Sequence, residues 1–347
     1  MSLYYTVFFL ALLLGVGLTP VCRAIGIRWN WVDTPNERKI HENPIPYLGG
    51  WSILISFLGA GVLGWLYLPS VLTENTNQIW GLFIASGIIF FLGVADDARG
   101  LNAPVKFTFQ IIASIILWYT GGRIEILTNP FGGQIQIGIF GLPLTILWLV
   151  GVTNAMNLID GLDGLACGVS YIASFTLFLI ALLQGEPIIA VLMAALAGST
   201  LGFLRFNLPP ASIFMGNSGA MTLGFLLAST AVITRYKATI ALTLLIPIVA
   251  LGIPILDTLF AIFRRAYRGR PIFQADREHL HHRLLKLGLS PRQVVFFVYL
   301  ISIFLSITAF SFIMIPKQFA FLILIGLGVL LLIGVLILRS LEKQRGK

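Results

Sequence analysis

Residues 143–184 read PLTILWLVGVTNAMNLIDGLDGLACGVSYIASFTLFLIALLQ. Two apolar runs, at 143–158 and 167–184, enclose a polar segment that contains two aspartates, two asparagines and two glycine turns. Each run approaches the length of about 20 residues at which a helix crosses the hydrocarbon core of a bilayer. We therefore predict two membrane-spanning helices, with the polar segment between them at the membrane surface.

The whole chain has the composition of a membrane protein. Of its 347 residues, 57% are hydrophobic and 11% are charged, and the mean hydropathy is +0.93. Soluble proteins carry about 25% charged residues, and the alternating pattern of a membrane β-barrel is absent. We expect an all-α polytopic membrane protein, with residues 1–347 forming one integral-membrane domain. About eleven spans are predicted, with ten as the alternative: 3–22, 46–68, 78–95, 104–120, 143–158, 167–184, 187–204, 219–234, 238–262, 293–314 and 318–339.

The basic residues predict the orientation of the chain. The first 20 residues resemble a signal peptide in length, but they lack a basic start and a cleavage site, and Arg23 and Arg28 follow the apolar run. A retained first helix with its N-terminus outside puts 19 of the 23 Lys and Arg residues, and the C-terminus, on the cytoplasmic side. The net charge of +9 then indicates loops that face anionic lipid and anionic substrates, rather than nucleic acid.

Two further features lie outside the spans. The predicted outer segment 124–142 alternates apolar and polar residues around Gly132-Gly133, which predicts a short β-hairpin. The two cysteines, Cys22 and Cys167, fall near predicted inner helix ends and do not suggest a disulfide.

Two pairs of carboxylates stand at the predicted cytoplasmic edge. Asp96 and Asp97 end one apolar run, and Asp160 and Asp163 interrupt another. Carboxylates at a membrane edge are functional candidates because they need cations or water, and two carboxylates with a phosphate substrate suit Mg²⁺. The alternative is that both pairs belong to solvated turns, since Asp-Gly is a common turn pair.

Three of the four histidines gather in one predicted inner loop, with arginines on both sides. His279, His281 and His282 lie between Arg277 and Arg283, which indicates hydrogen-bond donors for phosphate. A zinc site is the first alternative, but there is no thiolate nearby and the flanking arginines disfavour a cation. A solvated loop is the second.

Two more polar segments are predicted on the same side. NERKIHENPIPYLGG, at 36–50, carries a basic patch that either binds phosphate or only enforces orientation. FMGNSGAMTLGF, at 214–225, has glycines around Asn217 and Ser218 before an apolar helix. Such a turn presents backbone N–H groups to an anion, although ordinary helix capping by Asn or Ser is the alternative. All five sets together indicate an integral enzyme that acts on a soluble phosphorylated donor and a lipid-borne acceptor.

These motifs resemble those of a known family, the polyprenyl-phosphate N-acetylhexosamine-1-phosphate transferases. DDARGL at 96–101, the polar segment at 154–166, the glycine turn at 214–225 and DREHLHHRLLKLGLS at 276–290 match its successive motifs in order. The His-Leu-His-His form and NERKIH resemble the UDP-N-acetylglucosamine branch more than the muramoyl-pentapeptide branch. The resemblance implies transfer of GlcNAc 1-phosphate from UDP-GlcNAc to undecaprenyl phosphate with release of UMP. It also implies Mg²⁺ or Mn²⁺, the bacterial inner membrane, a homodimer, and a product that feeds a cell-envelope glycan such as lipopolysaccharide or teichoic acid.

The resemblance also implies roles for individual residues. Asp96 is expected to accept the proton of the lipid phosphate, with Asp97 close to the metal. Phe214 is expected to stack on uracil, and the histidines to hold diphosphate oxygens. The full set expected to bind substrate is Asn157, Asp160, Asp163, Phe214, His279, His281, His282, Arg283, Lys39 and Lys106.

One position departs from the family pattern. The family has a metal-binding Asp where this chain has Asn217, and a neutral amide is a poorer ligand for a hard cation. Three alternatives therefore stay open: the same chemistry with UDP-GalNAc or the muramoyl pentapeptide, a metal-weakened or inactive relative, and a transporter that uses Asp257 at membrane depth. The sequence shows no paired broken helices or inverted repeats that would favour the transporter.

Overall fold

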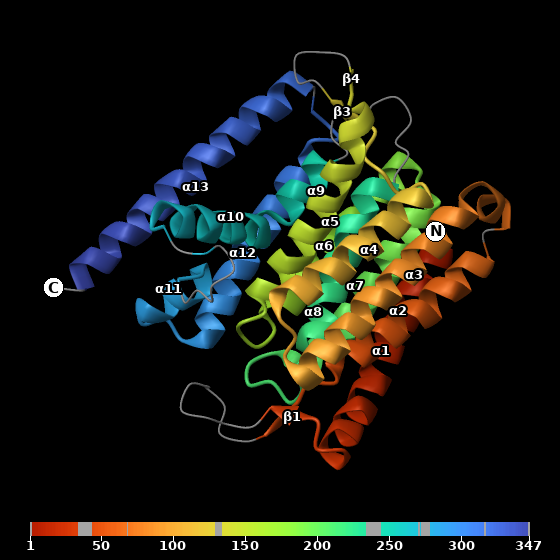
Figure 1. Cartoon of the computed structure of the whole chain (residues 1–347), viewed down its shortest axis with the longest axis horizontal. Helices are drawn as coiled ribbons and strands as arrows, with labels where there is room; N and C mark the ends of the chain where they lie inside the picture. The colour runs from red at the N-terminus through yellow and green to blue at the C-terminus, as the bar shows by residue number, and fades with distance from the viewer. Residues whose placement is uncertain are drawn as a thin grey trace.

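The computed structural model describes residues 2–33, 44–67, 69–128, 134–233, 244–269, 271, 278–315 and 317–345. These residues form a bundle of long helices with a broken helix and a separate C-terminal helix on one side (Figure 1). The helices are α1 (Ser2–Arg28), α2 (Gly49–Leu66), α3 (Pro69–Arg99), α4 (Ala103–Tyr119), α5 (Gly141–Ile159), α6 (Leu165–Gln184), α7 (Pro187–Asn207), α8 (Gly216–Ile233), α9 (Leu245–Ala250), α10 (Gly252–Tyr267), α11 (Leu280–Lys286), α12 (Pro291–Ser311) and α13 (Lys317–Arg345).

Within the described residues, seven helices are long and apolar enough to cross a membrane, so the chain is a multi-pass membrane protein. They include most of α3 and all or nearly all of the others, namely α1, α5, α6, α7, α8 and α12. The predicted spans at 46–68 and 104–120 correspond to shorter apolar helices, α2 and α4. The predicted span at 318–339 lies within α13.

The prediction of one continuous span over 238–262 is wrong. Residues 244–262 form two helices, α9 and α10, which are separated at Leu251 (φ −99°, ψ 22°). Pro254 has no N–H to donate to the carbonyl of Ala250, and its ring displaces that carbonyl, so a continuous helix is broken here. Figure 1 shows that α10 lies across the bundle instead of continuing along it.

Four short strands make two separate pairs. β1 (Val32–Asp33) pairs antiparallel with β2 (Ile45–Pro46) just before α2. In the predicted hairpin segment, β3 (Ile126–Thr128) pairs antiparallel with β4 (Gln134–Gln136), and a short 3-10 turn (Gly138–Phe140) leads into α5. The two pairs lie at opposite ends of the bundle (Figure 1).

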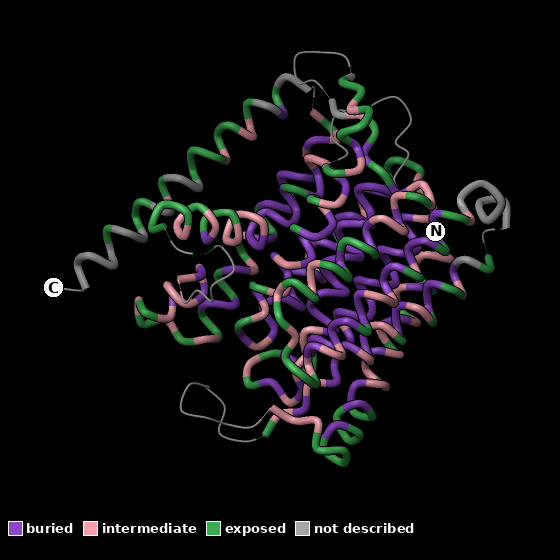
Figure 2. The backbone as a smooth tube through the Cα atoms, in the orientation of Figure 1, coloured by how far each residue is buried: buried purple, intermediate pink, exposed green. Residues whose placement is uncertain are grey.

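The core of the bundle is α8, in which every residue from Ser218 to Ile233 is buried (Figure 2). It packs against α2, α3, α5 and α6. Small residues allow these backbones to approach closely, as is common between helices in membranes. A Cβ added at Gly93 of α3 would overlap the backbone of Ser218, and one at Gly50 of α2 would overlap the backbone of Gly219. The N-terminus of α8 is thus held between the end of α3 and the start of α2.

We expect Gly93→Ala to lower the thermal stability of the protein in detergent, although Ala improves helix propensity by about 1 kcal/mol. The added methyl group collides with the Ser218 backbone, and overpacking of this kind costs about 1–3 kcal/mol. Gly87→Ala in the same helix is the matched control, because nothing lies within 4 Å of its new methyl group. Equal melting temperatures for the two variants would contradict the close contact between α3 and α8.

Candidate active site

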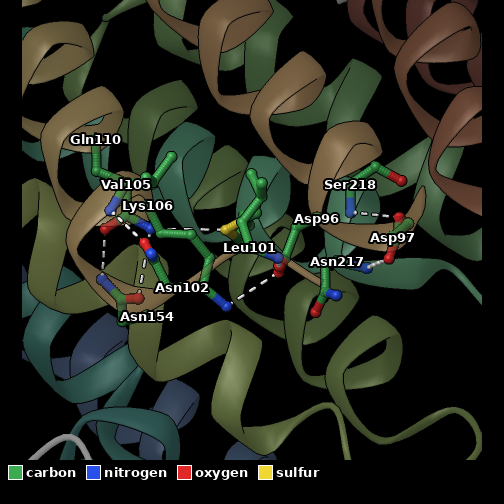
Figure 3. A network of polar contacts seen from close by, with 11 residues as sticks. Asp96, Asp97, Leu101, Asn102, Val105, Lys106, Gln110, Asn154, Asn217 and Ser218 are labelled. Atoms are coloured by element: carbon green, nitrogen blue, oxygen red, sulfur yellow. Dashed lines mark hydrogen bonds and ion pairs between the residues drawn. The ribbon is translucent and has the colours of Figure 1, made fainter. Parts of the chain in front are cut away.

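The N-terminus of α8 is capped by a carboxylate from α3. Asp97 Oδ1 accepts a hydrogen bond from the backbone N of Asn217 at 2.7 Å, and Asp97 Oδ2 accepts one from the backbone N of Ser218 at 3.1 Å (Figure 3). These are the N–H groups that the sequence predicted to bind an anion, and the anion that they bind is Asp97. Gly216 makes this approach feasible, since its φ of +71° and the Asp97 carboxylate beside it both exclude a side chain there.

The neighbouring carboxylate, Asp96, is buried and fully engaged. Its Oδ2 lies 3.0 Å from Lys106 Nζ, and its Oδ1 accepts a hydrogen bond from the backbone N of Leu101 at 2.8 Å. Lys106 follows Asn102, whose side chain caps α4 by accepting from the backbone N of Val105. Asp96 therefore ties the end of α3 to the start of α4, and it places the Lys106 ammonium beside the α8 turn (Figure 3).

One helical turn deeper, α4 is joined to α5 by a pair of amides. Asn154 Nδ2 donates to Gln110 Oε1 at 2.7 Å, and Gln110 Nε2 lies 3.4 Å from Asn154 Oδ1. Gln110 is buried. The sequence analysis did not single out Gln110, because a lone glutamine in an apolar run has no motif around it.

The turn between α5 and α6 is held from three sides. Asp163 Oδ2 accepts from the backbone N of Ala211 at 2.8 Å, and Asn207 Oδ1 accepts from the backbone N of Gly164 at 3.1 Å. The Tyr299 hydroxyl of α12 donates to the Gly164 carbonyl at 2.6 Å. Asp163 thus fixes the loop between α7 and α8, and Asn207 and Tyr299 are positioning groups that lie outside the predicted motifs.

Asp160 is different from the other three aspartates. Its side chain is half-buried, and within the described part of the chain no hydrogen bond or ion pair reaches its carboxylate. Burial raises the pKa of Asp160 to about 7, and the negative charges of Asp97 and Asp163 raise it further toward that value. An unpaired carboxylate next to other carboxylates is the feature that a cation or a donor group of a substrate would stabilise.

The three histidines do not have equivalent surroundings. His279 is buried, and its Nδ1 lies 2.7 Å from Asp257 Oδ2 of α10. His281 is only 2% exposed, yet neither of its ring nitrogens has a hydrogen-bond partner. Its imidazole lies directly over Gly161, where an added Cβ would overlap the ring. The histidine segment and the Asp160 turn, about 120 residues apart in the sequence, therefore meet at one place.

The surroundings of His281 favour its neutral form. Burial lowers its pKa from 6.5 to about 4, and the nearby His282 lowers it further toward that value. The ring of His282 lies 4.2 Å from that of His281 between centroids. A neutral imidazole can donate one hydrogen bond and accept another, and both positions on His281 are free for a ligand within the described structure.

A cavity of about 1710 Å³ lies between α10, α11, α12 and α13. Most of its lining is apolar, including Phe297 and Phe304 of α12. Its polar side includes Glu278, which pairs with Arg264 (3.2 Å) and Arg268 (2.6 Å). Asp257 and Arg283 also line it, so the cavity adjoins the histidine segment.

The remaining predicted site residues are placed as follows. Asn157 lies half-buried in the last turn of α5, and Phe214 lies half-buried just before α8, with its backbone N donating to the Pro46 carbonyl at 2.8 Å. His282 and Arg283 follow His281 in α11. Lys39 and Arg277 lie outside the described residues.

A metal ion at this site would need ligands beyond the protein. Among the described residues, no three His, Cys, Asp or Glu side chains are grouped so as to hold a metal ion. The donors present near the α8 turn are the Asp97 carboxylate, the unpaired Asp160 carboxylate and the Asn217 amide. Oxygen donors of this kind, completed by waters and phosphate oxygens, fit Mg²⁺ or Mn²⁺.

Comparison with known proteins agrees with this arrangement. A family profile described as glycosyl transferase family 4 matches residues 79–235. The chain is 40% identical over 303 residues to the probable undecaprenyl-phosphate N-acetylglucosaminyl 1-phosphate transferase of Bacillus subtilis, covering 87% of this chain and 83% of the relative. This chain belongs to the polyprenyl-phosphate N-acetylhexosamine-1-phosphate transferases.

Other relatives of this transferase have related names. The decaprenyl-phosphate N-acetylglucosaminephosphotransferase of Mycobacterium tuberculosis is 37% identical, with 80% of this chain and 74% of the relative covered. The undecaprenyl-phosphate alpha-N-acetylglucosaminyl 1-phosphate transferase of Thermotoga maritima is 32% identical, with 76% of each chain covered. The predicted family and branch are therefore confirmed.

We expect the folded transferase to lose stability as the pH falls from about 6.5 toward about 4. The unfolded chain binds a proton at His281 below pH 6.5, whereas the buried ring of the folded protein binds one only near pH 4. His281→Gln, which has no charge to gain, should lose less stability over this range. Thermal unfolding in detergent at pH 7.5, 6.0 and 4.5 measures both. Parallel curves for the two proteins would contradict a buried, neutral His281.

Proposed function

We propose that this transferase moves N-acetylglucosamine 1-phosphate from UDP-GlcNAc to undecaprenyl phosphate and releases UMP. An oxygen of the acceptor phosphate bonds to the sugar-proximal phosphorus of the donor, and the bond from that phosphorus to the bridging oxygen of UMP breaks. The observation that carries the proposal is the meeting of the Asp160–Gly161 turn with the unpaired His281. This meeting puts a carboxylate and a neutral imidazole at one end of a membrane bundle, next to the Asp97-capped turn of α8.

Phosphoryl transfer depends mainly on positioning and charge neutralisation, and the described contacts support both. Asn157, Asp163 and Phe214 come from segments that are fixed to one another, and we assign them to the nucleoside. His281, His282 and Arg283 are assigned to the diphosphate oxygens, as hydrogen-bond donors. Lys106, held by Asp96, lies on the opposite side of the α8 turn and is assigned to the acceptor phosphate. Lys39 keeps its predicted role as a phosphate-binding residue.

The proton acceptor deserves a choice between two aspartates. The family resemblance implies Asp96, but both Asp96 oxygens already accept hydrogen bonds, one of them from an ammonium. Asp160 has no such partner among the described residues, and its pKa of about 7 is close to the value that suits a general base at neutral pH. We therefore infer that Asp160 receives the proton and that Asp96 holds Lys106.

A divalent cation, Mg²⁺ or Mn²⁺, is part of this proposal. Asp97 and Asn217 would hold it at the start of α8, and Asp160 lies on the same side of the site. When bound, the ion neutralises charge on the diphosphate. The protein groups then keep their own tasks: Asp97 fixes the α8 turn, and the imidazole of His281 meets the oxygens that face away from the turn.

The setting of the reaction follows from the membrane fold. We propose a single transferase domain in the bacterial inner membrane, with the N-terminus outside, the C-terminus in the cytoplasm and the site on the cytoplasmic side. The apolar cavity beside α11 suits the hydrocarbon chain of a lipid acceptor. A homodimer, and a product used for a cell-envelope glycan, remain parts of the same proposal.

The transporter alternative finds little support in the contacts of Asp257. Both of its oxygens are engaged, one by His279 and one by the backbone N of Leu280. The second candidate that a specific residue favours is a metal-weakened relative, because Asn217 stands where the family has Asp.

We expect the purified protein to release UMP from radiolabelled UDP-GlcNAc only when undecaprenyl phosphate and Mg²⁺ are both present. Asp160→Asn should lower the rate by about a hundredfold, within the range attributed to loss of a general base, and Asp96→Asn should lower it less. UDP-GalNAc and the UDP-linked muramoyl pentapeptide serve as competing donors. Faster release from either donor would transfer the proposal to that sugar, and no release from any donor would reject it.

We expect Asn217→Asp to raise Mg²⁺-dependent transfer and to lower the Mg²⁺ concentration needed for half-maximal rate. A second carboxylate next to Asp97 adds a charged oxygen ligand for a hard cation. Asn217→Ala is the control and should give no gain. A titration of rate against Mg²⁺ for the three proteins measures the effect. If the Asp variant matches the wild type at every concentration, Asn217 is not a metal ligand.

A further inference from the structure

Asp257 is a buried carboxylate whose place in the reaction the proposed function leaves open. It lies in α10, six residues after the helix break at Leu251, and its side chain is only 10% exposed. Each oxygen has one partner at hydrogen-bonding distance: Oδ2 meets His279 Nδ1 at 2.7 Å, and Oδ1 accepts from the backbone N of Leu280 at 2.8 Å. Both partners belong to the start of α11.

The start of α11 depends on this carboxylate. α11 has seven residues, which is too short for a helix to be stable by itself. Its N-cap residue, His279, makes no side-chain capping bond of its own. Asp257 supplies that cap from another helix, as Asp97 does for α8, and at the same time it fixes the ring of the N-cap residue.

The position of α11 decides where His281 points. His281 is the second residue of the helix, and its ring lies against Gly161 with both nitrogens unpaired. A shift of α11 by one residue would rotate that ring by about 100° around the helix axis. The ring would then leave the Asp160 turn, since no other described hydrogen bond holds it there.

α10 is also in contact with the opposite side of the same site. It packs against α5, the helix that ends at the Asp160 turn. One helix therefore braces both the turn that carries Asp160 and the short helix that carries His281. Asp257 is the polar connection between them.

We propose that Asp257 is a positioning residue for the transfer reaction: through His279 and the N-terminus of α11, it holds the His281 imidazole over the Asp160–Gly161 turn. The reaction that it serves is the proposed function, and the contact that it makes is independent of that function. The inference predicts that loss of Asp257 impairs the donor side of the reaction through His281, not through general unfolding.

The first experiment measures the contact without any assay of activity. Hydrogen–deuterium exchange of the full-length protein in detergent should show faster exchange of the amides at 280–286 in Asp257→Leu. Leu fills a similar volume but accepts neither hydrogen bond. Thr258→Val is the matched control, because the Thr258 hydroxyl is buried without a partner in the described structure. It should leave exchange at 280–286 unchanged. Equal protection of α11 in wild type and Asp257→Leu would overturn the inference.

The second experiment asks whether Asp257 acts through His281. Asp257→Leu should lower kcat/KM for UDP-GlcNAc by at least about tenfold, consistent with the loss of two hydrogen bonds to a charged group, while KM for undecaprenyl phosphate stays within about twofold. Asp257→Asn should recover most of the activity. Its amide oxygen accepts from Leu280, and its N–H donates to the other tautomer of His279.

The double variant separates positioning from a structural role. In a His281→Gln background, Asp257→Leu should lower the rate by no more than about twofold further, since the group that it positions is already absent. Fully additive losses, or an equal loss in Thr258→Val, would overturn the inference. If the wild type transfers no sugar at all, the proposed function fails, and the exchange experiment still decides the role of Asp257.

Discussion

The fold depends on a carboxylate that satisfies the end of a buried helix. The first N–H groups of α8 have no partner within the helix, and they lie between α2 and α3, where the backbones are too close for side chains or much water. Asp97 fills that need with two hydrogen bonds. The attraction is strong because a negative charge meets the positive end of the helix dipole in a partly buried place. The same bonds fix the turn that carries Asn217, so one interaction serves both the core and the candidate site.

A similar device recurs at α11, where Asp257 caps a helix that belongs to another part of the chain. In both places the carboxylate comes from a helix and the capped N-terminus follows a loop. The loops can therefore differ in sequence while their ends stay in place. Asp163 and Asn207 add the same kind of connection between the α5–α6 turn and the loop before α8. The site is thus assembled from side chains that bind backbone, which gives rigidity without a large polar core.

Much of this arrangement was visible in the sequence, and what was missed has physical causes. The apolar runs and the polar segments between them predicted the helical membrane fold and the candidate residues, because hydrophobic length is a strong signal. The break at Leu251 was missed because 238–262 is apolar throughout, although Pro254 was present to break the helix. The three histidines looked equivalent in sequence, and only the contact of His279 with Asp257 separates it from His281. The direct bond from Asp97 to the α8 turn spans 120 residues and depends on the packing of glycines, which no local pattern encodes.

The burial of α8 also bears on how the protein responds to its bilayer. No residue of this helix from Ser218 onward faces outward, whereas α1, α3 and α12 expose large apolar side chains such as Phe9, Phe91 and Phe296. Changes in lipid thickness or lateral pressure act on helices that touch lipid, by tilting them. The helix that anchors the Asn217 turn is insulated from those forces by a full layer of neighbours. The geometry around the turn is therefore set by protein contacts, and it stays constant as the lipid composition of the membrane varies.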